Sequence, residues 1–117
     1  MVDLKCTADF CIIPIGTPTA SLSQYIAEVQ VMIRSSGLTY SMHSAGTTVE
    51  GPWDEVTELI GKAHQVLHDL GIPRAQSDIR IGTRIDKKQS FPEKVAVVEK
   101  ILEEKKKQQA SETKSVV

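Results

Sequence analysis

The sequence lacks any apolar run that approaches the ~20 residues of a membrane-spanning helix. It also lacks an excess of basic residues, because 14 Lys and Arg are set against 15 Asp and Glu, for a net charge of -1. Proteins dedicated to nucleic acids or to membrane surfaces carry a strong positive excess. We therefore expect neither nucleic acid nor membrane among the partners of this 117-residue chain.

Cysteine is scarce as well, with Cys6 and Cys11 as the two thiols. On one extended strand, residues five apart point to opposite faces, so these two cannot form a disulfide with each other. A single domain of this length buries enough surface to fold without a disulfide or a metal. Free thiols suit a reducing compartment, and the N-terminal residues lack the charged and then apolar pattern of a secretory signal. We expect a cytoplasmic protein.

Motifs of catalysis are missing too. The chain has no G-x-S-x-G nucleophile turn and no glycine-rich loop that could cradle a phosphate. His64 and His68 are one helical turn apart, as in zinc proteases, but Gln65 stands where the general base would be, and no good third ligand is present. We expect surface histidines, no bound metal, no cofactor and no catalytic residue. A metal-dependent hydrolase is the least favoured alternative.

Apolar periodicity predicts an alternation of strands and helices. Ser21 with Gln24, and Ser90 with Glu93, have the spacing of a capping box, and Pro52 suits the first position of a helix. The predicted elements are, in order, a strand at 4–15, a helix at 21–36, strands at 38–43 and 47–50, a helix at 52–70, a strand at 77–84 and a helix from 90.

Right-handed crossovers turn the first six of these elements into a ferredoxin-like α+β sandwich, a split βαβ arrangement that the last helix follows. We expect this domain to span residues 1–104. A flexible polar tail would occupy 105–117, where the sequence is rich in lysine and has no apolar period. Because the end of the first strand is apolar on both faces, the sheet face without helices should also be covered, most simply by a second copy of the chain.

Glycine followed by threonine recurs at three predicted strand ends, at 16–17, 46–47 and 82–83. Glycine permits close backbone approach there, and threonine adds a hydroxyl. Other polar and aromatic residues stand nearby in the sequence, namely Ser21, Ser23, His43, Ser44, Glu50, Trp53 and Asp54. Hydroxyls with a carboxylate and an indole suit a small heterocycle that accepts hydrogen bonds and carries positive charge. The alternative is structural: the glycines shape turns and Ser21 caps its helix.

Six segments of the chain form an ordered set: Ile13–Thr17, Ser21–Tyr25, Ser36–Tyr40, His43–Gly51, Asp54–Val56 and Ile79–Lys87. Together they resemble the small thiamine-binding protein family, over about residues 8–102. The resemblance implies a ferredoxin-like fold and dimers that pair through their sheets and often assemble into tetramers. It also implies binding of thiamine (vitamin B1), or of its hydroxymethylpyrimidine half, without catalysis.

The same resemblance implies which residues bind the ligand. Segments 17–23 and 43–50 would border the pocket, with Glu50 as the partner of the ligand's aminopyrimidine or of its cation. The other implied site residues are Thr17, Ser21, Ser23, His43, Ser44 and Thr47.

Two positions depart from the family pattern. Ser44–Ala45 stands where many members have Pro-Met, which makes one pocket wall smaller, and Gln65 stands where Glu is usual. The alternative function is a structural or regulatory interaction module that assembles through its sheet face and binds no small molecule.

Overall fold

The computed structural model describes the backbone of residues 2–115 and the side chains of residues 2–110. The chain divides into two compact units, one ending at Ile85 and one beginning at Asp86. The element order matches the order predicted from periodicity. The elements are β1 (Lys5–Ile15), α1 (Ser23–Ser35), β2 (Thr39–His43), β3 (Gly46–Pro52), α2 (Trp53–Asp69), β4 (Arg74–Thr83) and α3 (Phe91–Ser115).

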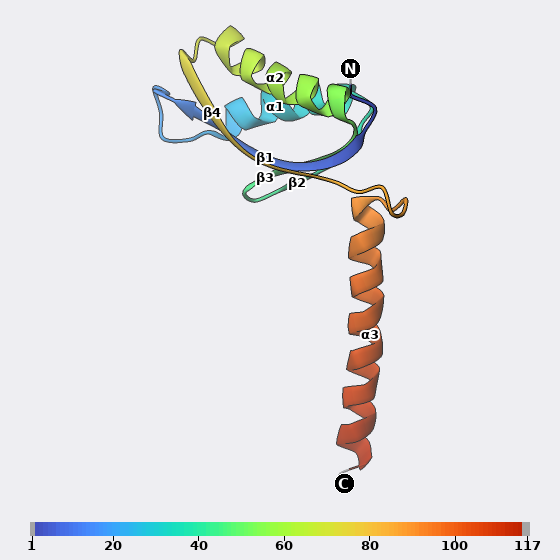
Figure 1. Ribbon diagram of the computed structural model, residues 1–117. Helices are drawn as coiled ribbons and strands as arrows, with labels where there is room; N and C mark the ends of the chain where they lie inside the picture. The colour runs from blue at the N-terminus through green and yellow to red at the C-terminus, as the bar shows by residue number, and fades with distance from the viewer. Residues whose placement is uncertain (1, 116–117) are drawn as a thin grey trace. The chain divides into compact units, whose positions relative to one another are not determined.

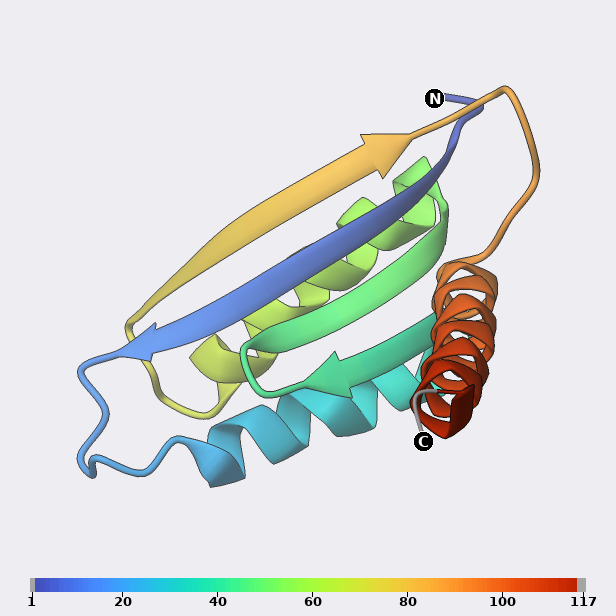
Figure 2. The ribbon, with the colours of Figure 1, turned by 90° about the horizontal axis from the view of Figure 1, so that it is seen from below.

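The first unit is a two-layer sandwich. Its four strands form one sheet in the order β2-β3-β1-β4, and every neighbouring pair is antiparallel. Figure 2 shows the strands side by side in front of α1 and α2, and Figure 1 shows both helices on one face of the sheet. This arrangement confirms the predicted ferredoxin-like α+β fold.

The core lies between the sheet and the two helices, and strand alternation decides which residues enter it. In β1, the even-numbered side chains from Cys6 to Ile12 are buried, whereas their odd-numbered neighbours point to the other face. The helices contribute side chains at helical spacing, including Val29 and Ile33 from α1. The most deeply buried large side chains are Ile33, Leu67, Val29, Val49 and Val56.

The start of α1 differs from the prediction. The helix begins at Ser23 rather than at Ser21, and the residue before it, Leu22, makes no side-chain capping bond. The preceding loop bonds to itself instead, because the Thr17 hydroxyl donates to the Thr19 carbonyl (2.7 Å) and the Thr19 hydroxyl donates to the Ser21 carbonyl (3.2 Å). These turn bonds hold Ser21 outside the helix, so the predicted Ser21–Gln24 capping box is wrong.

The second predicted capping box is confirmed at α3. The backbone N–H of Ser90 donates to the Glu93 carboxylate (3.2 Å), and the backbone N–H of Glu93 donates to the Ser90 hydroxyl (3.4 Å). This reciprocal pair satisfies two donors at the beginning of the helix.

Helix α3 continues through residues 105–115 of the segment that was expected to be a flexible polar tail, and the flexibility of that tail stays a prediction. This last part of the helix, from residue 105 to Ser115, has no apolar period, but its lysine, glutamine and alanine residues favour helix on their own. Residues 116–117 of the predicted tail lie outside the described residues, and the predicted domain limit at 104 stays a prediction. Every helix in the described part of the chain is too short or too polar to cross a membrane.

Candidate functional site

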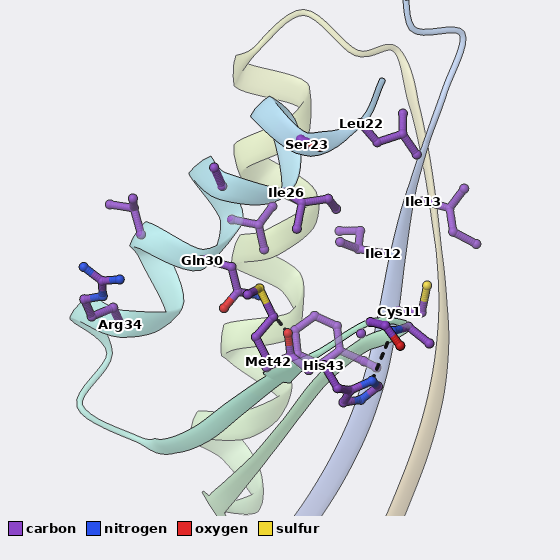
Figure 3. Close-up of a pocket in the computed structure, with 18 residues that line it drawn as sticks. Cys11, Ile12, Ile13, Leu22, Ser23, Ile26, Gln30, Arg34, Met42 and His43 are labelled. Carbon is purple, nitrogen blue, oxygen red and sulfur yellow. Dashed lines mark hydrogen bonds between the residues drawn. The ribbon is translucent and has the colours of Figure 1, made fainter. Parts of the chain in front are cut away.

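A cleft of about 760 Å³ lies along α1. Three segments line it: Leu22 with α1 as far as Arg34, β1 at residues 10–13, and the end of the β2–β3 hairpin from Met42 to Thr47 (Figure 3). All of them belong to the first compact unit. The cleft therefore sits where the helix, the central strand and the hairpin end meet.

Helix α1 serves the core and the cleft with two adjacent stripes. Val29 and Ile33 are buried in the core. Ser23, Ile26, Gln30 and Arg34 recur every three or four residues and line the cleft (Figure 3). The apolar spacing in the sequence predicts a single core stripe of Leu22, Ile26, Val29 and Ile33, and in the structure Leu22 and Ile26 of that stripe line the cleft.

The hairpin end reaches the cleft because Gly46 lies against β1. A Cβ atom at this position would stand 2.4 Å from the backbone carbonyl oxygen of Phe10, which no side chain can tolerate. The close backbone approach that the Gly-Thr pattern predicted is confirmed at Gly46, whereas a Cβ at Gly16 or Gly82 would meet nothing within 4 Å. The contact places Thr47, the next residue, at the wall of the cleft.

Thr47 and Gln30 form the best-defined polar contact of the cleft. The Gln30 side-chain amide donates to the Thr47 hydroxyl oxygen over 2.8 Å, and Thr47 is only 3% exposed. The bond ties α1 to β3 and fixes both side chains at the cleft wall. Sequence reasoning missed Gln30, because a glutamine on a helix is ordinarily solvated; the available signal was its position four residues after the apolar Ile26.

His43 stabilises the hairpin end from the other side. Its Nδ1 accepts the backbone N–H of Ala45 (3.2 Å), so in the neutral ring Nε2 carries the proton and donates to the Asp9 carboxylate (2.6 Å). The Thr48 hydroxyl donates to the same Asp9 oxygen (3.3 Å). Because the two side chains are 40% and 46% exposed, this pairing contributes little stability but orients the loop at Ser44.

The charge of the cleft is one-sided. Arg34 and His43 are the basic residues that line it, although the His43 imidazole is turned to the opposite face of the sheet, where it bonds to Asp9, and no carboxylate occurs among the described lining residues. The remaining walls are mostly apolar, with Leu22, Ile26 and Ile12 among them. A ligand of this cleft would meet apolar surface, a few hydrogen-bonding groups and a guanidinium.

The seven predicted site residues lie in three places, of which Glu50 occupies one by itself. Ser23, His43, Ser44 and Thr47 line the cleft together. Thr17 and Ser21 lie in the loop before α1 and are not among the lining residues.

Glu50 lies on the opposite face of the sheet from Thr47. Residues alternate along β3, so Val49, which is fully buried, faces the helices and Glu50 faces away from them. There the Thr7 hydroxyl donates to a Glu50 carboxylate oxygen (3.4 Å), and Glu50 is 6% exposed. The sheet therefore stands between this carboxylate and the cleft, and the structure does not place Glu50 where a ligand in the cleft would meet it.

The two histidines of α2 bond to separate partners. His64 Nε2 lies 2.9 Å from the Ser77 hydroxyl, and His68 Nδ1 lies 2.8 Å from the Ile72 carbonyl oxygen. The described residues contain no group of three or more His, Cys, Asp or Glu side chains that could hold a metal ion.

Both cysteines are free thiols in different surroundings. Cys6 is 3% exposed, and burial raises the pKa of its thiol because a buried thiolate loses solvation. Cys11 is half-buried and lines the cleft. The two thiols point to opposite faces of β1, as the spacing predicted.

Comparison with protein families and curated proteins gives consistent matches. The model of a family described as "Thiamine-binding protein" matches residues 8–99. UPF0045 protein ECM15 of Eremothecium gossypii is 48% identical over 102 residues, which are 87% of this chain and 97% of that protein. UPF0045 protein sll0230 of Synechocystis is 43% identical over 95 residues, which are 81% of this chain and 78% of that protein.

Solved structures share the fold. A hypothetical protein from Methanocaldococcus jannaschii superimposes with a TM-score of 0.72 at 28% identity, covering 80% of this chain and 95% of that one. A Thermotoga maritima protein provisionally assigned to thiamine biosynthesis or salvage superimposes with a TM-score of 0.67 at 22% identity, covering 80% of this chain and 98% of that one. At 22% identity, the similarity to the Thermotoga maritima protein shows the fold alone.

Proposed function

Because this chain belongs to the thiamine-binding protein family, we propose that it binds thiamine, or the hydroxymethylpyrimidine half of that vitamin, in the cleft along α1. The observation that carries the proposal is the cleft itself. Its volume of about 760 Å³ falls within the range of small-molecule sites, which bury an apolar ligand body and orient it with few polar groups.

The polar groups of the cleft suit a pyrimidine ring. The Gln30 amide and the Thr47 hydroxyl hold each other in place, so they form a rigid pair rather than two mobile side chains. Ser23 and Ser44 add hydroxyls from two other segments. A ring with nitrogen acceptors and an amino donor would bond to these groups while its faces contact Ile26 and Ile12.

We propose binding without chemical change of the ligand, in the cytoplasm. The cleft offers no serine–histidine pair at hydrogen-bonding distance among its described residues, and its histidine is already bonded to Asp9 and Ala45. The cytoplasmic location rests on the two free thiols, which suit a reducing compartment.

Self-association to a dimer or tetramer is part of the proposal. Helix α3 carries apolar side chains that are between 47% and 58% exposed: Val95, Val98, Ile101 and Leu102. Exposed apolar surface of this kind is typical of assembly sites. This observation also favours the alternative function, in which the chain is an interaction module with no small-molecule ligand.

A thermal-shift experiment tests ligand binding. We expect thiamine or hydroxymethylpyrimidine at millimolar concentration to raise the melting temperature, since a ligand at ~100 times its dissociation constant stabilises a fold by about 2.7 kcal/mol. Gln30→Ala should weaken the response. The matched control is Gln65→Ala, because Gln65 is an exposed glutamine that bonds to Asp69 on α2 and lies away from the cleft. No response in the unchanged protein, or equal loss in both variants, would contradict the proposal.

Sedimentation equilibrium tests assembly separately. The unchanged protein should sediment as a dimer or tetramer, and Val98→Lys with Leu102→Lys should lower its mass toward that of a monomer, because lysine cannot be buried unpaired. A monomeric unchanged protein would contradict self-association. An oligomer that gives no thermal response to either compound would instead favour the interaction module.

A further inference from the structure

We propose that the cleft selects a phosphate-bearing form of its ligand and that Arg34 binds the phosphate. The inference rests on the proposed function, because it specifies the chemical class of molecule that the same cleft accepts. Three observations support it: the position of Arg34, the charges around it and the distribution of apolar groups along α1.

Arg34 stands in the last turn of α1, at the end of the lining stripe. Among the described residues, no ion pair joins a carboxylate to its guanidinium. A guanidinium without a carboxylate partner retains its full capacity for a bidentate bond to an oxyanion.

The surrounding charges favour an anion. The described lining residues include no Asp or Glu, so nothing in the wall would repel a phosphate or compete with it for Arg34. Free thiamine carries a thiazolium cation and no negative charge, and this cation would meet no carboxylate in the cleft. Glu50, the carboxylate expected to receive it, lies across the sheet beside Thr7. A phosphate group supplies the charge complement that the free vitamin lacks.

The spacing along α1 suits a ligand with a ring at one end and a phosphate at the other. With a rise of 1.5 Å per residue, Arg34 lies roughly 6 Å beyond Gln30 and roughly 12 Å beyond Ile26 along the helix axis. A pyrimidine ring between Ile26 and the Gln30–Thr47 pair would therefore direct its substituent toward Arg34. The apolar end at Leu22 and Ile26 offers no comparable group for a phosphate.

A different role for Arg34 makes a distinguishable prediction. A basic side chain in the last turn of a helix also favours the helix dipole. If that were its whole role, Arg34→Gln would lower the melting temperature slightly and leave the ligand preference as it was.

Isothermal titration calorimetry tests the inference with thiamine, thiamine monophosphate, hydroxymethylpyrimidine, hydroxymethylpyrimidine phosphate and inorganic phosphate. The unchanged protein should bind each phosphorylated compound at least about tenfold more tightly than its parent, the range expected of a charge-assisted bond. Arg34→Gln should remove this difference between the phosphorylated compounds and their parents. Arg34→Lys should retain part of it. Arg74→Gln, which changes an exposed arginine at the start of β4, should retain all of it.

Each other outcome contradicts a definite claim. Equal affinity of the unchanged protein for parent and phosphorylated compounds overturns the inference and leaves the proposed function standing. A preference that survives Arg34→Gln overturns the role of Arg34. If inorganic phosphate binds as tightly as the two phosphorylated compounds, the cleft holds an anion site without ligand selection, and the proposal is overturned. Absence of binding by all five compounds contradicts the proposed function and the inference together.

Discussion

The two faces of β3 bury one polar side chain each, and they do so in opposite ways. Thr47 faces the helices, is 3% exposed and accepts a bond from Gln30 across the cleft wall. Glu50 faces away, is 6% exposed and accepts a bond from Thr7 of the neighbouring strand. The helix face therefore presents the neutral Gln30–Thr47 pair, beside a cleft that no carboxylate lines among the described residues. The opposite face holds the Glu50 carboxylate.

Residues that are close in sequence on one strand therefore need not belong to one site. Residues 47 and 50 are three apart, and an odd spacing in a strand always sends two side chains to opposite faces. Ligand chemistry follows from the same geometry: a cleft on the helix side is suited to neutral and anionic groups, whereas a cation would be better placed on the side of Glu50 and Asp9. Four substitutions, on one face, on the other or at the hairpin end between them, test whether the two faces are independent.

Gly46→Ala should have the largest effect, because it disturbs the hairpin end that both faces share. The added Cβ would lie 2.4 Å from the Phe10 carbonyl oxygen, and backbone cannot move aside as a flexible side chain would. We expect the free energy of unfolding to fall by about 3 kcal/mol, the upper part of the range for overpacking. Urea denaturation measures it. Gly82→Ala is the control, since a Cβ there meets nothing within 4 Å; an equal loss in both variants would contradict the account.

Glu50→Ala should affect stability but not the cleft. Removing the carboxylate deprives the Thr7 hydroxyl of its acceptor and leaves space at a buried position. We expect the free energy of unfolding to fall by about 2 kcal/mol, as for other buried hydrogen-bonded groups. Calorimetry should give unchanged affinity for the cleft ligand. A large loss of affinity without loss of folding would instead return Glu50 to the binding site that the family resemblance implied.

Thr47→Val should affect ligand binding in the cleft more than it affects stability. Valine keeps the shape of threonine but leaves the Gln30 amide without its acceptor, so the rigid polar pair is lost. We expect about 1 kcal/mol less stability, in line with one hydrogen bond, and a clear loss of ligand affinity. Thr48→Val, on the next residue and the opposite face, is the matched control. Equal affinities for the two variants would contradict the assignment of the helix face to ligand binding.

Asp9→Asn should give the smallest effect. It removes the charge that faces His43, but both side chains are nearly half exposed, and such pairs contribute about 0.5 kcal/mol. Urea denaturation should show a loss of this size. A loss of several kcal/mol would show that the pair is more important to the fold than its exposure indicates.

Much of the fold could be predicted from the sequence because burial leaves a periodic record. The alternation in β1 and the helical spacing of Val29 and Ile33 both follow from which side chains enter the core. The start of α1 could not be predicted, since a capping spacing at Ser21 competes with turn bonds from Thr17 and Thr19 that only the folded loop reveals. The length of α3 was missed because it has helix-favouring residues without an apolar stripe at its end.

The candidate site was predictable only in part. Gly46 and Thr47 could be identified, because a glycine–threonine pair at a strand end has a physical reason to lie close to other backbone. Gln30 and Arg34 were not, because their spacing of four and eight residues from Ile26 shows a shared helix face but does not show whether that face lines a cleft or meets solvent. The alternation of strand side chains, which the sequence did contain, places Glu50 and Thr47 on opposite faces of β3, and a role of Glu50 in ligand binding stays a prediction.

The central claim is that the helix face of the sheet, and not the face of Glu50, holds the thiamine-related ligand. An NMR titration of the ¹⁵N-labelled protein with thiamine monophosphate tests it most directly. The account predicts that the amide shifts of Ile26, Gln30 and Thr47 move together and saturate, while those of Thr7 and Thr39, which pair with Glu50 from the two neighbouring strands, stay in place. Saturable shifts confined to Thr7, Thr39 and Glu50, or no shifts at all, would contradict it.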